Sequence, residues 1–371
     1  MTLSVFYSEF ALDDPEDITE WVTDVQVVVG RKRIIDRWQP SEVTVTLIDP
    51  NPVATLVIGG YLTVKGIGFS IVSMERNYGI PYNAGTGAAP QDIVTLRGLS
   101  YGLRYCGAIK YQNETLAQNT LEEYAYVATG NVSLSGAPTF VGPAWSTFTA
   151  KLTSFSGSGL DFLNSLVNGV VGYVQDQGVF NNVIFQNNLT LGSSGAFAAD
   201  NLVNFTDTGA QSSTTNTYYF DQIQFLASTE NDYGLVVVTY NVGANTVTSG
   251  AGGAEYQTNT LLNQQSQAQQ MADVLHAILS ASDLAPYAIS TKASITDGFD
   301  QVTQTGYDLV GTRIGITFRG QTYNAICEGF TITSTINDDR YTYYLSPAIA
   351  QALILDDTEF GILDTNTLAL G

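Results

Sequence analysis

A stretch near the end of the chain, residues 308–347, has a strict two-residue period that few folds can satisfy. Ile314, Ile316 and Phe318 alternate with small or polar residues, as in a strand with one buried face. Arg319-Gly320 then suits a tight hairpin turn, because glycine reaches positive φ without steric cost. The stretch therefore predicts a twisted antiparallel meander, a unit from which small barrels are built.

The second strand of this meander changes face partway along. Odd-numbered positions are apolar from Tyr323 to Cys327, whereas even-numbered positions are apolar from Phe330 onward. One extra residue beside a glycine produces such a change, so we predict a β-bulge at Glu328-Gly329. After a turn at Asn337–Asp339, a third strand is expected to continue the inner face.

An amphipathic helix is predicted just upstream, over residues 263–284, and is expected to pack on the second barrel. Asn263 or Ser266 can cap its start, and Pro286 prevents much further extension. Its apolar positions recur at helical spacing and form one stripe: Ala268, Met271, Ala272, Leu275, Ile278 and Leu279.

The first hundred residues repeat the logic of the C-terminal meander. Five or six short alternating strands with regular turns indicate a small barrel or sandwich. Residues 59–98 run strand, glycine turn, strand, loop, strand, and residues 310–345 run in the same order. This pattern predicts two related barrels in one chain.

The predicted fold is mainly β, with two small antiparallel β-barrel domains and an α+β insertion. We expect an N-terminal barrel over 1–105, an inserted module over 106–218, a second barrel with its helix over 219–347, and an extension over 348–371. A helix capped by Ser158 is expected in the inserted module. Residues 223–229 and 235–240 are expected to pair as a hairpin.

The charge balance excludes one class of function. The 371 residues include 14 Lys and Arg against 35 Asp and Glu, a net charge of −21. Such a field repels phosphate, so stable nucleic-acid binding is not expected. Charged residues make up only 13% of the chain, which suggests that much of the uncharged polar surface meets other protein.

Compartment signals point to assembly in a reducing cytosol. The N-terminal stretch has no basic region of a signal peptide, and no apolar run reaches the length of a membrane span. Cys106 and Cys327 form no metal-binding or redox spacing, and Cys327 is expected to act as a small core hydrophobe.

No catalytic, cofactor-binding or metal site is predicted. His276, the single histidine, borders the apolar helix stripe, where such residues are usually structural. Serine elbows, phosphate loops, dinucleotide fingerprints and zinc spacings are absent from the sequence. An acidic run at Asp13, Asp14, Glu16 and Asp17 lacks the calcium-loop spacing and is expected to be a solvated loop.

A basic cluster at Arg31, Lys32, Arg33 and Arg37 is conspicuous in so acidic a chain. One interpretation places the cluster on an edge strand, where charge opposes aggregation. The other makes it a docking site for an acidic neighbour in an assembly. The sequence does not choose between them.

Four stretches give the chain its resemblance to the minor tail, or tail-hub, proteins of long-tailed bacteriophages. The last of them, with its closing acidic FG-LD run, is the most specific. They are VTDVQVVVGRKRIIDRWQPSEVTVTLIDPNP (residues 22–52), DFLNSLVNGVVGYVQDQG (161–178), TNTLLNQQSQAQQMADVLHAILSASDLAPYAIS (258–290) and LDDTEFGILD (355–364).

The resemblance implies a non-enzymatic virion protein of the tail tip or baseplate, assembled in the cytoplasm of the bacterial host. Such hubs join the tail tube to the distal tip or fibres, and are commonly trimers in which two similar barrels per chain meet a hexameric ring. Partners would be further copies of the chain together with tube, distal-tail, tip or fibre proteins. An acidic bore would let DNA pass without binding it.

Three alternatives remain open. The chain could form a sixfold distal-tail ring or adaptor, or act as a receptor- or glycan-binding tail-tip module through exposed Trp and Tyr clusters in 106–220. A cell-wall hydrolase needs only two carboxylates at a suitable separation, but nothing in the sequence selects such a pair.

Overall fold

The computed structural model describes most of the chain. The described residues are 3–10, 13–49, 56–79, 92–129, 139–141, 144–176, 183–186, 203–208, 217–226, 233–241, 243–280, 285–292, 309–335 and 338–348. The predicted extension over 348–371 lies outside these ranges except for residue 348. The turn residue Asn337 also lies outside them.

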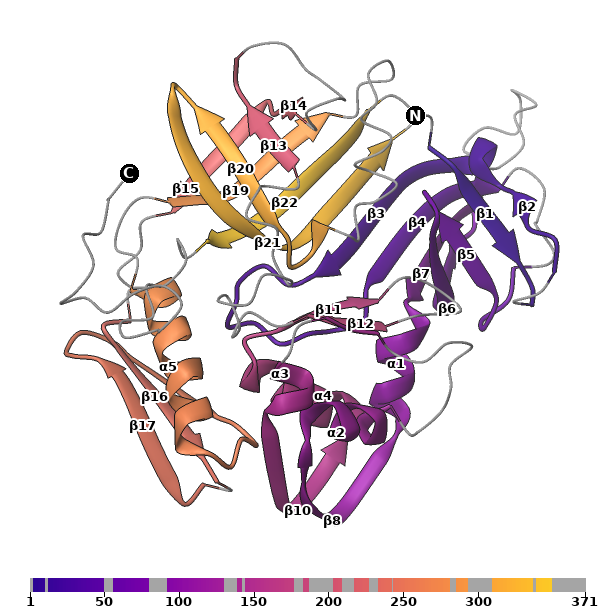
Figure 1. The fold of residues 1–371 in the computed structure, drawn as a ribbon. Coiled ribbons are helices and arrows are strands. Elements are labelled where there is room, and N and C mark those ends of the chain that lie inside the picture. The colour runs from indigo at the N-terminus through magenta and orange to yellow at the C-terminus, as the bar shows by residue number, and fades with distance from the viewer. Residues whose placement is uncertain are drawn as a thin grey trace, which may run out of the picture.

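One large mixed sheet organises the molecule (Figure 1). Its path runs β14-β13-β20-β21-β3-β4-β7-β6-β5-β1-β2, and β21 also carries the branch β22-β19-β15. The strands are β1 (Val5–Ser8), β2 (Glu16–Asp17), β3 (Val22–Gly30), β4 (Glu42–Asp49), β5 (Tyr61–Val64), β6 (Ile67–Asn77), β7 (Asp92–Leu99), β13 (Val203–Thr206), β14 (Thr217–Tyr219), β15 (Gln222–Leu226), β19 (Ala285–Lys292), β20 (Arg313–Phe318), β21 (Gln321–Thr335) and β22 (Asp339–Pro347).

The predicted internal repeat is present in the strand order. Strands β3-β4-β7-β6-β5 lie side by side in that order, and β15-β19-β22-β21-β20 repeat it in the same chain sequence. Both sets contain a hairpin turn of a basic residue and glycine at positive φ, Lys65-Gly66 (50° and 82°) and Arg319-Gly320 (51° and 78°). Each set also carries a bulge in its long strand. The matching strand order makes the two sets equivalent in topology.

The mainly β character and the meander are confirmed. The register of β21 against β22 shifts between Cys327 and Gly329, which is the bulge expected at Glu328-Gly329. Within the described residues no strand pairing closes either set into a barrel, so closure stays a prediction.

The second half of the chain also contains a separate three-stranded sheet, β17-β16-β18, covered by α5. Helix α5 spans Gln265–Leu279 and buries the whole predicted stripe, but it begins at Gln264 without a side-chain cap. It packs mainly on β16 (Leu235–Tyr240) and β17 (Asn245–Gly250) rather than on the meander; β18 is Glu255–Asn259.

The expected hairpin between residues 223–229 and 235–240 is wrong. Strand β15 pairs with β19, and β16 pairs with β17 and β18. Alternation of apolar residues marks a strand but does not identify its partner, which here lies far away in sequence.

The inserted module combines four helices with two small sheets. An aromatic cluster of Tyr111, Tyr124, Phe155 and Phe162 lies inside it. Its elements are α1 (Tyr101–Ala108), β8 (Lys110–Thr120), α2 (Leu121–Ala128), β9 (Thr139–Val141), α3 (Ala144–Thr147), β10 (Thr149–Ser158), α4 (Gly159–Gly169), β11 (Tyr173–Asp176) and β12 (Val183–Gln186). β13 and the first two residues of β14 also fall within 106–218, but these strands join the large sheet beside β20.

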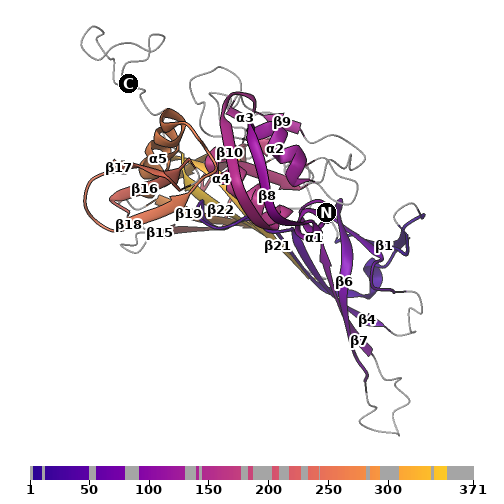
Figure 2. The same cartoon turned by 90° about the horizontal axis from the view of Figure 1, so that it is seen from below.

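Figure 2 shows β4, β6 and β7 extending toward one end of the molecule, with α5 and its sheet at the other end and the inserted module between them. The two topologically equivalent sets meet where β3 pairs with β21. Their common core is therefore continuous rather than divided into separate bodies.

Two facing glycines allow β3 and β21 to approach closely where their pairing ends. Gly30 lies opposite Gly329. A Cβ atom added at Gly30 would lie 2.5 Å from the Glu328 carbonyl oxygen, and one at Gly329 would lie 2.4 Å from the Val29 carbonyl oxygen. Because backbone atoms cause both conflicts, a side-chain rotation cannot relieve them.

We expect Gly30→Ala to destabilise the protein more than Gly320→Ala. The two glycines have nearly equal φ, 76° and 78°, but a Cβ atom at Gly320 meets nothing within 4 Å. The left-handed backbone costs ~1–2 kcal/mol at either position. Crowding adds ~1–3 kcal/mol at Gly30 alone. Urea unfolding of both variants measures the difference, and equal losses would contradict the close approach.

Candidate functional site at the junction of the two sheets

A buried ion pair lies where the two strand sets meet. Arg31 follows the last residue of β3, and its backbone N–H donates to the Glu328 carbonyl oxygen at 3.1 Å. Its Nε lies 2.7 Å from Glu328 Oε2, and the two side chains are only 2% and 0% exposed. Glu328 is the extra residue of the bulge, so the local irregularity of β21 supplies the carboxylate at this position.

The inserted module completes this ion pair. The Tyr173 hydroxyl donates to Glu328 Oε1 at 3.0 Å, and Arg31 Nη2 donates to the Gly172 carbonyl oxygen at 3.4 Å. The guanidinium carbon lies 4.6 Å from the Trp38 ring centre and 5.1 Å from that of Tyr173. Buried charges are tolerated when they are paired and hydrogen-bonded, and both conditions are met here.

A second buried ion pair joins the same two strand sets elsewhere. Lys65, in the β5–β6 turn, pairs with Asp339 at the start of β22, and the side chains are 3% and 8% exposed. Lys65 Nζ also lies 5.4 Å from the Tyr341 ring centre. Both of these buried pairs therefore hold the first strand set against the second.

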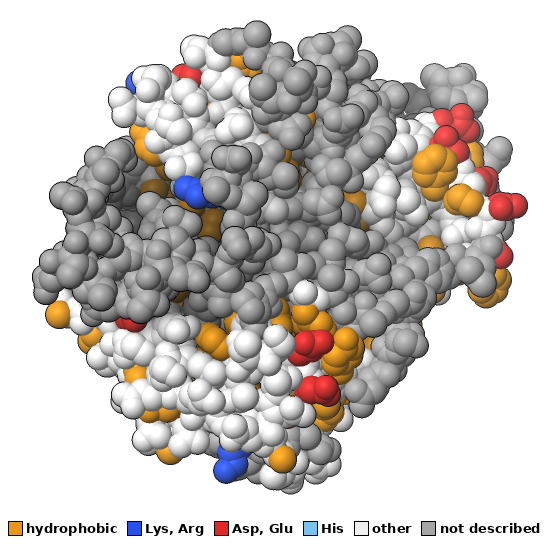
Figure 3. Space-filling model, viewed as in Figure 1, with side chains coloured by type: hydrophobic (Ala, Val, Ile, Leu, Met, Phe, Trp, Pro, Cys, Tyr) orange, Lys and Arg blue, Asp and Glu red, His pale blue; other side chains and the backbone are white. Residues whose placement is uncertain are grey.

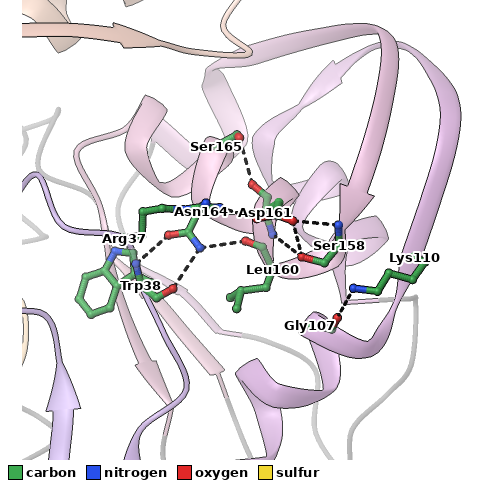
Figure 4. A network of polar contacts seen from close by, with 9 residues as sticks. All are labelled: Arg37, Trp38, Gly107, Lys110, Ser158, Leu160, Asp161, Asn164 and Ser165. Atoms are coloured by element: carbon green, nitrogen blue, oxygen red, sulfur yellow. Dashed lines mark hydrogen bonds and ion pairs between the residues drawn. The ribbon is translucent and has the colours of Figure 1, made fainter.

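Helix α4 holds the loop that follows Arg31 (Figure 4). The Trp38 backbone N–H donates to Asn164 Oδ1 at 2.8 Å, and Asn164 Nδ2 donates to the Trp38 carbonyl oxygen at 3.1 Å. Arg37 pairs with Asp161 at the first turn of the same helix. Loop and helix are thereby fixed together through one buried amide and one exposed ion pair.

Asp161 also closes the capping box of α4. Its backbone N–H donates to Ser158 Oγ, and its carboxylate accepts from the Ser158 backbone N–H. The hydrogen bonds from Ser158, with a smaller contribution from Arg37, lower the pKa of Asp161 to about 2. The Ser158 cap predicted from the sequence is confirmed.

The structure separates the four basic residues of the predicted cluster. Arg31 is buried inside the chain, so it is not a docking residue for a partner. Arg33 pairs with Asp36 and Arg37 with Asp161, both on the surface, and the exposed Lys32 lies 5.3 Å from the Tyr344 ring centre. The edge-strand interpretation is wrong, since the cluster lies in a loop after β3, and β3 is paired on both sides.

The other titratable residues singled out in the sequence are engaged in packing. His276 packs so closely on Gly250 that a Cβ atom there would lie 2.3 Å from His276 Nε2. Burial raises the pKa of the Cys106 thiol to about 12 and raises that of Cys327 as well, which disfavours a reactive thiolate. Among the described residues no group of His, Cys, Asp and Glu side chains is arranged to hold a metal ion.

Sequence reasoning missed two partners of the junction. Glu328 carried a signal, because an acid between Cys327 and Phe330 interrupts an apolar run and is expected to need a buried cation. Tyr173 had no comparable signal, since its hydroxyl could equally have faced solvent. The pairing of Arg31 with Glu328 spans 297 residues and follows only from the strand topology.

We expect Arg31→Met to lower the free energy of unfolding by about 3–5 kcal/mol, because it leaves the Glu328 carboxylate buried without its cation. Arg97→Met is the matched control. It breaks an ion pair with Glu42 whose side chains are 49% and 38% exposed, and should cost about 0–1 kcal/mol. Urea denaturation of both variants makes the comparison. Similar small losses would show that the junction does not depend on this pair.

Asp161→Asn should lower stability at neutral pH by about 1 kcal/mol through loss of the capping box. The effect is small because the carboxylate is 44% exposed and screened by solvent. A lowered folded-state pKa stabilises above the unfolded value of 3.8, and that contribution is lost as pH falls through about 2. The difference between variant and parent should therefore shrink between pH 4 and pH 2. Asp273→Asn at an exposed position of helix α5 serves as the control in acid unfolding.

Comparisons of the sequence with known families and curated proteins find no match. Within the described residues, no helix combines the length and apolar character needed to cross a membrane.

Solved structures of phage tail proteins have similar folds. The tail protein from Neisseria meningitidis MC58 aligns with a TM-score of 0.61 at 8% identity, over 93% of this chain and 97% of that chain. The 43 kDa tail protein of prophage MuSo2 from Shewanella oneidensis gives 0.57 at 8% identity, over 93% and 98%. Prophage tail protein gp18 from Listeria monocytogenes EGD-e gives 0.52 at 12% identity, over 92% and 94%. The chain thus has, along nearly its whole length, the fold of phage tail proteins, in agreement with the resemblance seen in the sequence.

Proposed function

We propose that this protein is a structural component of a phage tail or baseplate, and within it the hub that joins the tail tube to the distal tip or fibres. The observation that carries the proposal is the repeated strand order, β3-β4-β7-β6-β5 and β15-β19-β22-β21-β20, in a chain with the fold of tail proteins. Three chains with two equivalent sets each present six similar surfaces, which suits a sixfold ring.

The rigid link between the two sets supports this role. A pseudo-sixfold surface requires a fixed orientation of one set relative to the other. The continuous β3–β21 pairing and the two buried ion pairs supply such a constraint. The titratable groups at the junction are engaged in this constraint, which favours a structural protein over an enzyme.

The proposed channel follows from charge. The chain carries a net charge of −21, and a bore lined by acidic groups would repel DNA phosphates and let the genome pass. The exposed part of the basic loop, Lys32, Arg33 and Arg37, is proposed to contact an acidic neighbour in the assembly.

Native mass spectrometry of the purified protein tests the proposal through its stoichiometry. We expect three copies, since only a trimer converts two equivalent sets into a sixfold arrangement. Six copies would instead favour a distal-tail ring or adaptor, and a monomer at micromolar concentration would contradict a self-assembling hub.

A zymogram against the host envelope, together with binding to host cell-wall sugar, separates the remaining alternatives. The hub account predicts neither lysis nor sugar binding. A cleared band would indicate a cell-wall hydrolase, and saturable sugar binding would indicate a receptor-binding module.

A further inference from the structure

We infer that the corner of the molecule formed by β1, β2 and β5 is a docking surface for a different protein, one that presents an apolar site surrounded by Lys and Arg. The inference rests on the proposed place of the chain in an assembled tail. It concerns a surface that β4, β7 and β6 separate, along the sheet, from β3 and the Arg31–Glu328 junction.

Three large hydrophobic side chains are exposed at this corner. Phe10 is 64% exposed, Val57 38% and Ile58 65%, and only seven large hydrophobics are this exposed in the described part of the chain. Phe10 follows β1, and Ile58 precedes β5. Because Ser8 pairs with Tyr61 in the antiparallel β1–β5 ladder, both segments lie beyond the same end of that ladder.

Backbone hydrogen bonds hold the residues that carry these hydrophobic side chains. The Gly60 backbone N–H donates to the Val57 carbonyl oxygen at 3.1 Å, and the Val57 N–H donates to the Tyr7 hydroxyl at 3.2 Å. The Asp13 N–H donates to the Phe10 carbonyl oxygen at 3.1 Å. Apolar residues held outward on turn tips do not contribute to the core, and exposed apolar groups of this kind mark interaction sites.

Acidic side chains surround the apolar residues. Figure 3 shows hydrophobic groups flanked by acidic ones over β1, β2 and β5. The exposed acids of the segment are Glu9, Asp13, Asp14, Glu16 and Asp17, and the first 30 residues contain no Lys or Arg. An apolar centre with a rim of one charge sign is complementary to an apolar site with a rim of the other sign.

A second copy of this chain is a poor match for that rim. Among the described residues, seven basic side chains pair with carboxylates of the same chain: Arg31, Arg33, Arg37, Lys65, Arg97, Lys292 and Arg340. The exposed loop with Lys32, Arg33 and Arg37 is the nearest match in this chain, but Arg33 and Arg37 already pair with Asp36 and Asp161. No exposed large hydrophobic side chain lies in that loop, so it does not offer an apolar site with a basic rim. The complementary charge therefore comes from another protein of the assembly.

Zero-length carbodiimide cross-linking of the intact particle tests the inference, because the reagent joins carboxylates only to lysines in direct contact. We expect the segment 9–17 to be linked to lysines of a different virion protein. Links only to lysines of this chain, or no links from the segment, would overturn the inference. Absence of the chain from the particle would instead overturn the proposed function.

Variants of the acidic and apolar residues at this corner give a second test. Asp14→Lys/Glu16→Lys should reduce incorporation of the chain into particles about tenfold or more through charge repulsion. Phe10→Ser should reduce it through loss of the apolar contact. Glu255→Lys/Asp273→Lys changes the charge equally on the exposed surface of β18 and α5 and should incorporate normally. Thermal melting of each purified variant confirms that it is folded, and normal incorporation of the first two would also overturn the inference.

Discussion

The buried contact between Arg31 and Glu328 determines how the rest of this molecule is arranged. Each charge is stable in the interior only because the other is present. The Tyr173 hydroxyl donates to the Glu328 carboxylate, the Gly172 carbonyl oxygen accepts from the Arg31 guanidinium, and the Trp38 ring packs against that guanidinium. These groups come from the first strand set, the second strand set and the inserted module. Three parts that are distant in sequence must therefore fold together before any of them can bury these groups.

The junction also explains two irregularities of the backbone. A bulge at Glu328 interrupts the ladder, and facing glycines let two strands approach closely beside it. Both features weaken a regular sheet, yet together they bring the Arg31 backbone and side chain onto Glu328. These features fix the register of β21 against β3, because a slip by one residue would leave the Glu328 carboxylate buried without a cation.

Local features of the fold were predictable from the sequence, whereas long-range pairings were not. The meander, the bulge, the Ser158 cap and the apolar stripe of α5 follow from periodicity and turn chemistry within a few residues. The partner of β15, the sheet under α5 and the partner of Arg31 depend on segments far apart in sequence, which local patterns do not encode. Arg31 is conspicuous in so acidic a sequence, but its neighbours Lys32, Arg33 and Arg37 give the cluster the pattern of a surface feature.

In the proposed hub, two equivalent strand sets, locked into one body, give each chain two similar faces for a ring. A reconstruction of the assembled protein by electron cryomicroscopy can show whether both faces are used. We expect three chains around one axis, with the β3–β7 set and the β15–β22 set alternating at equivalent radius. A ring in which only one of the two sets faces the axis, or a particle containing a single chain, would contradict this expectation.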